Sequence, residues 1–166
     1  MKILMFPLSW VLAHVGRTVQ IAEALRKRGH EVVFAGERPG HSLSYLRFAK
    51  EAGFRIVPVK EPQWHLAWKR FHDRGAWMGV WDFFNDQKWA PLEDILEDML
   101  RVVGQEQPDL LLGDASIGVS TVGHITGIKA AGILNSYNLR FFQPHSLYRG
   151  LIRACDRFKW APIRAR

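Results

Sequence analysis

Residues 1–36, MKILMFPLSWVLAHVGRTVQIAEALRKRGHEVVFAG, contain a complete strand–helix–strand pattern. The apolar run at 2–6 is typical of a strand buried on both faces of a parallel sheet. Apolar residues then recur at helical spacing up to Gly29, where the helix is expected to end, and a second strand follows at 31–35. Because such crossovers are right-handed, the two strands are predicted to run parallel.

The same alternation continues along the chain, which favours a doubly wound, parallel α/β sheet in a single domain. Ser42 can cap a helix that runs to about Glu51, and Pro91 suits the first turn of a longer helix that Pro108 stops. The further strands are expected at 54–59, 109–113 and 130–134, and the further helices at 42–51, 91–107 and 117–126.

Composition limits the classes of protein that the chain can represent. Its 166 residues suffice for one domain, and 48% hydrophobic with 23% charged residues is typical of a soluble globular protein. A single cysteine, Cys155, excludes an internal disulfide, and no apolar run is long enough for a membrane helix or shaped like a signal peptide. A cytoplasmic protein is the simplest expectation.

The net charge of +7 is unevenly distributed. From Arg140 onward there are seven Arg or Lys residues and one acid, Asp156. Such a basic segment would suit peripheral contact with a membrane surface, although a solvated helix explains it equally well. Nucleic-acid binding would rest on charge alone, so no nucleic acid is expected as a partner.

Residues 62–90 interrupt the alternation of strands and helices. They contain five of the seven tryptophans, together with Phe71, Phe83 and Phe84. One interpretation is a helical insertion whose aromatic side chains pack on the sheet, because aromatics are core residues first. The other is an apolar wall that binds a bulky acceptor or a lipid surface.

Polar side chains are expected at the carboxyl edge of the sheet, where open α/β sheets bind ligands. They are Ser9, His14, His41, Asp114, Ser116, Asn135, Ser136 and Asn138. Among them, His14 and Asp114 suit a base and the carboxylate that orients it, since a carboxylate on one ring nitrogen leaves the other free to take a proton. The plainer alternatives are a solvated His14 and an Asp114 that caps the following helix.

Several motifs are absent from the sequence. The first turn lacks the glycines of a dinucleotide or nucleoside-triphosphate site, and neither an H-E-x-x-H pair nor a Cys/His cluster indicates a metal. There is also no G-x-S-x-G, which argues against an esterase. We therefore expect neither a metal site nor a tightly bound cofactor.

The opening stretch, with ALRKRGHEVVF at its end and PDLLLGD later, resembles the N-terminal domain of GT-B fold glycosyltransferases, in particular the UDP- and macrolide-glycosyltransferase group. The resemblance covers about residues 1–140, with Ala13 standing where the family usually has glycine. It implies that His14 is the base that deprotonates the acceptor hydroxyl and that Asp114 orients it. Sugar transfer would then be inverting and independent of metal.

The resemblance also implies that residues 1–166 form the acceptor-binding half of such an enzyme. The donor-binding domain that holds the nucleotide sugar has no counterpart in this sequence. A C-terminal domain or a partner chain is expected to supply it. The chain alone is therefore not expected to catalyse sugar transfer. The small-molecule partner expected for this acceptor-binding half is hydrophobic and carries a hydroxyl group. The candidate acceptor-binding residues are Trp10, Trp64, Trp77, Trp81, Phe84, Asn135 and Ser136.

Two other functions fit the same pattern. A non-catalytic Rossmann-like module would bind a partner chain or a small ligand, and a downstream donor-binding half would argue against it. An epimerase with the same fold would need catalytic acids at the cleft, and the sequence does not identify them.

Overall fold

A computed structural model describes residues 1–36, 44–61, 92–116 and 118–134. Strands and helices alternate along these residues, as predicted, and those up to Ile133 belong to one compact unit. No helix in these ranges is long and apolar enough to cross a membrane. The elements are β1 (Lys2–Pro7), α1 (Leu12–Lys27), β2 (Glu31–Gly36), α2 (Arg47–Glu51), β3 (Arg55–Pro58), α5 (Leu92–Glu106), β4 (Leu110–Asp114), α6 (Val119–Thr126) and β5 (Lys129–Ile133).

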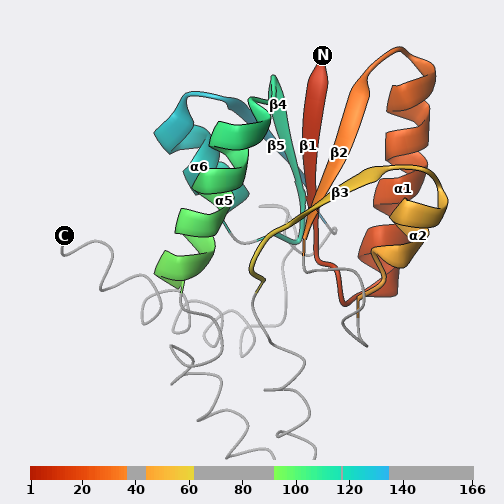
Figure 1. Cartoon of the computed structure of the whole chain (residues 1–166), viewed down its shortest axis with the longest axis horizontal. Coiled ribbons are helices and arrows are strands. Elements are labelled where there is room, and N and C mark those ends of the chain that lie inside the picture. Colours follow the sequence, from red (N-terminus) through yellow and green to blue (C-terminus); the bar gives the residue numbers. More distant parts are fainter. Residues whose placement is uncertain (37–43, 62–91, 117, 135–166) are drawn as a thin grey trace, which may run out of the picture. The chain divides into compact units, whose positions relative to one another are not determined.

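The strands form one parallel sheet in the order β3-β2-β1-β4-β5. Figure 1 shows α1 and α2 on one side of this sheet and α5 and α6 on the other. The chain therefore has the doubly wound architecture that the alternating pattern predicts. Because all strands run the same way, the loops after β1, β2, β3 and β4 leave from one edge.

The sheet is buried between two apolar clusters. Strand residues alternate between them, so that Leu4 and Phe6 face α5 and α6 while Ile3 and Met5 face α1 and α2. On α5, Ile95, Met99, Val102 and Val103 are buried, whereas Leu96 and Leu100 are partly buried. The continuous apolar run of β1 is explained by burial on both of its faces.

One predicted helix begins later than expected. The sequence places its start at Ser42, but Tyr45 and Leu46 form a turn and α2 begins at Arg47. The backbone N–H of Tyr45 donates to the carbonyl of Ser9 at 2.8 Å, which ties this turn to the loop after β1. A contact distant in sequence therefore overrides the local capping signal. The aromatic insertion at 62–90 and the basic tail, which is the segment from Arg140 onward, lie outside the described residues.

Two glycines in helices differ in the space around them. A Cβ added at Gly123 of α6 would lie 2.7 Å from Ala130 Cβ and 3.0 Å from the carbonyl oxygen of Ile128, whereas one at Gly104 of α5 would have nothing within 4 Å. We expect Gly123→Ala to lower the free energy of unfolding by about 1–3 kcal/mol through overpacking against β5. Gly104→Ala should raise it by about 0.5–1 kcal/mol through helix propensity. Chemical denaturation of both variants measures the contrast, and equal effects would contradict it.

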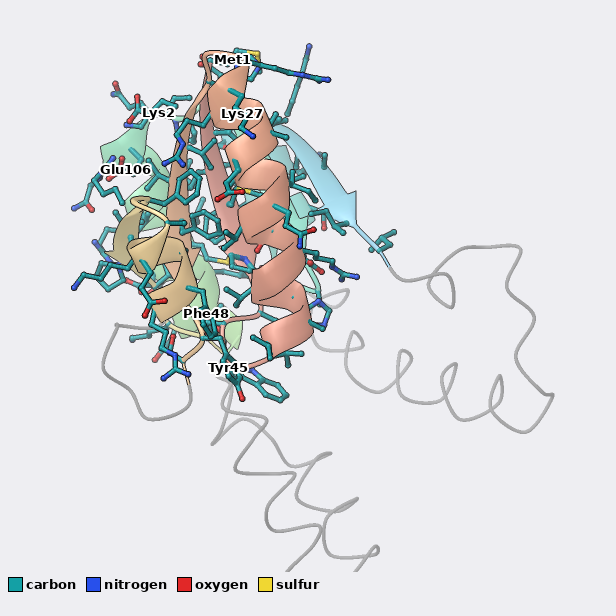
Figure 2. All side chains as sticks on the ribbon, turned by 90° about the vertical axis from the view of Figure 1, so that its right-hand side faces the viewer. Met1, Lys2, Lys27, Tyr45, Phe48 and Glu106 are labelled. Atoms are coloured by element: carbon teal, nitrogen blue, oxygen red, sulfur yellow. The ribbon has the colours of Figure 1, made fainter. Side chains whose placement is uncertain are left out.

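The amino edge of the sheet carries a charged cluster, visible around Lys2 and Glu106 in Figure 2. Arg55 donates to both carboxylate oxygens of Glu106, with Nη1 at 2.8 Å from Oε1, and Lys2 Nζ lies 3.0 Å from Oε2. The hydrogen bond from Arg55 is the main cause that lowers the pKa of Glu106 to about 2. This cluster lies away from the carboxyl edge and serves stability.

The lowered pKa of Glu106 has a consequence for acid stability. A carboxylate whose folded pKa is depressed stabilises the fold above its unfolded pKa of 4.5, and that stabilisation is lost as the pH falls from 4.5 to about 2. Because Arg55 is 52% exposed, solvent screening limits the effect to about 1 kcal/mol. We expect Glu106→Gln to destabilise the protein at pH 7, and the difference from the wild type to shrink below pH 4.5 and to vanish once the pH falls below about 2. Glu97→Gln, on an exposed position of the same helix, should show no such convergence.

Candidate functional site

The ends of β1 and β4 bring two distant parts of the sequence together at the carboxyl edge. Pro7 is in register with Asp114, and the backbone N–H of Leu8 donates to the carbonyl of Asp114 at 3.1 Å. The N–H of Val11 then donates to the carbonyl of Leu8, so that the chain turns directly into α1. His14 is the third residue of this helix and therefore lies beside the end of β4.

The side chains of His14 and Asp114 are in contact. Nδ1 of His14 lies 2.7 Å from Oδ1 of Asp114, whose side chain is fully buried, while His14 is 13% exposed. Asp114 does not cap the next helix, because the N-cap of α6 is Gly118 and it makes no side-chain cap hydrogen bond. The carboxylate instead contacts a side chain of α1, so the interpretation of Asp114 as a helix cap is wrong.

Arg17 is a third member of this cluster. It lies one turn after His14 on α1, and its Nε and Nη2 donate to Oδ2 and Oδ1 of Asp114 in a forked pair. Nη2 also lies 2.8 Å from Nδ1 of His14. A buried carboxylate is costly without a compensating charge, and the guanidinium supplies one. Asp114 thus joins an imidazole and a cation, both from the same helix.

Ser9 holds the loop between β1 and α1 in place through hydrogen bonds of its backbone. Its N–H donates to Oε2 of Glu61 at 3.0 Å, and its carbonyl accepts from Tyr45 as described above. Ser9 is fully buried, and its hydroxyl has no hydrogen-bond partner among the described residues. A Cβ at Gly36 would come within 2.7 Å of Oε1 of Glu61, so the end of β2 leaves room for this carboxylate. These contacts fix the start of α1, and with it His14.

A pocket lies beside these loops on the side of the sheet that α5 covers. Its lining is mostly apolar, with Lys60, Glu61 and Ser116 as polar members. Ala115 adopts a positive φ of 53° immediately after Asp114, so the chain turns sharply between the buried carboxylate and the pocket wall. The apolar lining residues are Phe6, Pro7, Leu8, Ala35, Val59, Ile95, Met99 and Ala115.

The structure describes only some of the candidate residues. Trp10 is partly buried in the loop after β1, Ser116 lines the pocket, and Ser9 is buried in the contacts given above. The other candidates lie outside the described residues: His41, Trp64, Trp77, Trp81, Phe84, Asn135, Ser136 and Asn138. Their part in binding an acceptor stays a prediction.

Two charged residues of this edge are missing from the candidates based on sequence. Arg17 has a recognisable signal, because a residue three positions after His14 lies on the same face of a helix. Glu61 has none, since it follows a short edge strand and reaches Ser9 only through the fold. The sheet edge therefore contains a cation and a carboxylate beyond the expected pair.

Comparison with solved structures shows what this fold is similar to. The spinosyn rhamnosyltransferase SpnG, complexed with thymidine diphosphate, matches 85% of this chain with a TM-score of 0.57 and 21% identity. The spinosyn forosaminyltransferase SpnP matches 93% with a TM-score of 0.58 and 22% identity. The glycosyltransferase SnogD from Streptomyces nogalater matches 95% with a TM-score of 0.55 and 18% identity. At these identities the likeness establishes the fold, and the predicted resemblance to GT-B glycosyltransferases is confirmed at that level.

The chain covers 37%, 35% and 41% of these three structures, which is well under half of each. No protein-family model and no curated protein sequence matches the chain. What the described residues share with these enzymes is thus the architecture of one part of a larger molecule.

Proposed function

We propose that the chain is the acceptor-binding half of an inverting, metal-independent glycosyltransferase that uses a nucleotide-sugar donor and a hydrophobic, hydroxylated acceptor. The observation that carries this proposal is the 2.7 Å contact between Nδ1 of His14 and Oδ1 of the buried Asp114 at the carboxyl edge of the sheet. A base with one nitrogen bound to a carboxylate suits the removal of a proton from a hydroxyl.

In the proposed reaction, Nδ1–H of His14 donates to Asp114 and Nε2 accepts the proton of the acceptor hydroxyl. The acceptor oxygen forms a bond to the anomeric carbon while the bond from that carbon to the nucleotide diphosphate oxygen breaks. The leaving diphosphate keeps the electron pair, and attack from the opposite face inverts the configuration. Asp114 stabilises the imidazolium that forms, and the proposed step uses no metal.

The donor-binding half would come from a C-terminal domain or a partner chain. The fold neighbours support this division, because they are glycosyltransferases more than twice as long as the part that this chain matches. SpnG has been solved with thymidine diphosphate and with spinosyn aglycone, which exemplify a nucleotide and a hydrophobic acceptor. We extend the proposal to a cytoplasmic protein with peripheral membrane contact through its basic tail.

Two measurements test this proposal. Calorimetry with the chain alone should detect apolar, hydroxylated acceptors and little binding of nucleotide sugars. The chain joined to its donor-binding domain, or mixed with its donor-binding partner chain, should transfer sugar in the presence of EDTA. The product should have the inverted anomeric configuration. Retention of configuration, a requirement for metal, or no transfer with any donor-binding half would each contradict the proposal.

A non-catalytic binding module is the second candidate. It is favoured by the forked Arg17–Asp114 pair, because a purely structural ion pair would have the same geometry. For such a module, replacing His14 would change stability or ligand binding without affecting any transfer reaction. The substitutions of His14 and Asp114 considered in the Discussion separate the two candidates.

A further inference from the structure

The helices on the two sides of the sheet differ in charge. The helix α5 contains five acids and one base. The helices α1 and α2, with Arg28 directly after α1, contain six Lys or Arg residues and two acids, Glu23 and Glu51. Figure 2 looks onto α1 and α2, with Lys27 labelled near the end of α1. The sheet therefore separates a basic side from an acidic side.

Ion pairs compensate much of the acidic charge on α5. Nζ of Lys60 lies 3.4 Å from Oδ2 of Asp94, and Nη2 of Arg101 lies 2.7 Å from Oδ1 of Asp98. The carboxylate of Glu106 belongs to the charged cluster at the amino edge of the sheet. Because these acids already have cationic partners, their attraction for a further cation is weak.

The bases on the other side are not compensated in this way. Within the described ranges, the exposed cations of this side that are in no ion pair form the basic face: Arg26, Lys27, Arg28, Arg47 and Lys50. Arg26 and Arg47 lie over the rings of Phe54 and Phe48, with Cζ at 4.3 and 5.0 Å from the ring centroids, and these contacts leave the positive charges in place. A positive surface without anionic partners in the fold favours an anionic partner outside it.

The distribution of these cations indicates the kind of anion. They come from two helices and the residue after α1, and none of them lines the pocket at the carboxyl edge. A small anion is bound by polar groups that converge on one point. An anionic bilayer instead attracts lysine and arginine side chains that are spread over a surface. The basic face therefore fits a lipid surface better than a small ligand.

Two other partners fit this face less well. Single-stranded nucleic acid is bound through aromatic rings on which the bases stack. Here the ring of Phe54 is buried beneath Arg26. Phe48 is stacked on Tyr45 and has Arg47 over its ring. A second copy of the chain could present only the compensated acids of α5, and contact between opposite sides of the molecule would form an open chain of molecules.

We propose that the basic face docks the chain on a bilayer that contains anionic phospholipid, with α5 on the side away from the headgroups. This docking surface goes beyond the contact through the basic tail. It rests on the proposed function only in placing a hydrophobic acceptor at the membrane. Docking of the free chain needs no sugar transfer, so the two proposals can fail separately.

The test is sedimentation of the full 166-residue chain with vesicles of phosphatidylcholine alone or mixed with phosphatidylserine. The wild type should bind the mixed vesicles and not the neutral ones, and the binding should weaken as the salt concentration rises. Lys27→Gln/Lys50→Gln should lower the partition coefficient by about 20-fold, because each cation near an anionic leaflet contributes about fivefold.

Arg55→Gln/Arg101→Gln is the matched control, because it removes the same two charges from side chains that contact acids of α5. It should bind mixed vesicles as the wild type does. Circular dichroism checks that each variant folds. If the loss of Arg55 impairs folding, the single variants Lys27→Gln and Arg101→Gln give the same contrast, with an expected loss of about fivefold for the first.

Four results would overturn the proposal. The first is a wild type that does not bind the anionic vesicles, and the second is unchanged binding by Lys27→Gln/Lys50→Gln. The third is an equal loss in both double variants, which would assign the binding to net charge. The fourth is a loss of binding to an RNA oligonucleotide, or of self-association at low salt, without a loss of binding to vesicles. Docking without sugar transfer by the complete enzyme would refute the proposed function and leave this inference intact.

Discussion

Replacing His14 with glutamine should reduce sugar transfer by about 10²–10⁴-fold, measured as kcat with the donor-binding half present. Glutamine is polar and of similar length, but its amide cannot accept a proton from a hydroxyl at neutral pH. The loss should fall on kcat and leave the Kd of the acceptor nearly unchanged, because the proton transfer occurs only in the reaction.

His124→Gln is the matched control for this experiment. His124 lies in the last turn of α6 and is exposed, so the same substitution there should leave kcat unchanged. If His14→Gln transfers sugar at the wild-type rate, His14 is not the base. The non-catalytic candidate would then be preferred.

Replacing Asp114 with asparagine should lower kcat by about 10²-fold or more, and the loss should not add to that of His14→Gln. Asparagine keeps the shape of the buried side chain but removes the negative charge that stabilises the imidazolium. Once the base is gone, the carboxylate has no catalytic partner left. The double variant should therefore be about as slow as His14→Gln alone, because residues that act as a unit are non-additive.

Asp109→Asn provides the control for this substitution. Asp109 precedes β4 at the opposite edge of the sheet, where its Oδ2 accepts from the N–H of Lys2 at 2.6 Å. This substitution should leave sugar transfer unchanged and lower the stability of the fold only slightly. Additive losses in the double variant would instead mean that Asp114 acts independently of His14.

Most of the fold could be predicted from residues 1–36 and their repeated pattern, because both faces of the sheet are buried and the strands read as apolar runs. Boundaries were less accurate where tertiary contacts decide them. The helix expected from Ser42 begins at Arg47, since the N–H of Tyr45 binds the loop after β1. A pattern within one segment contains no information about a partner thirty-six residues earlier.

The site was predictable only in outline. The rule that parallel strands end at one edge places His14 near Asp114, but the sequence fits equally well a solvated His14 and an Asp114 that caps a helix. Arg17 was missed because a basic residue on an amphipathic helix is typical of a solvated face. Glu61 was missed because its contact with Ser9 depends on the neighbouring position of β2 and β3. In both cases the role is determined by the packing of elements and not by local spacing.

The registry of Pro7 with Asp114 also has a consequence for the time course of folding. His14 and Asp114 are 100 residues apart, so their contact closes a long loop and is entropically expensive to form early. The unit β1–α1–β2 can assemble from contacts within 36 residues, whereas the dyad must wait for β4 to dock beside β1. A nascent chain thus contains its histidine well before it contains a site. This ordering keeps His14 separated from Asp114 until the central strands have paired.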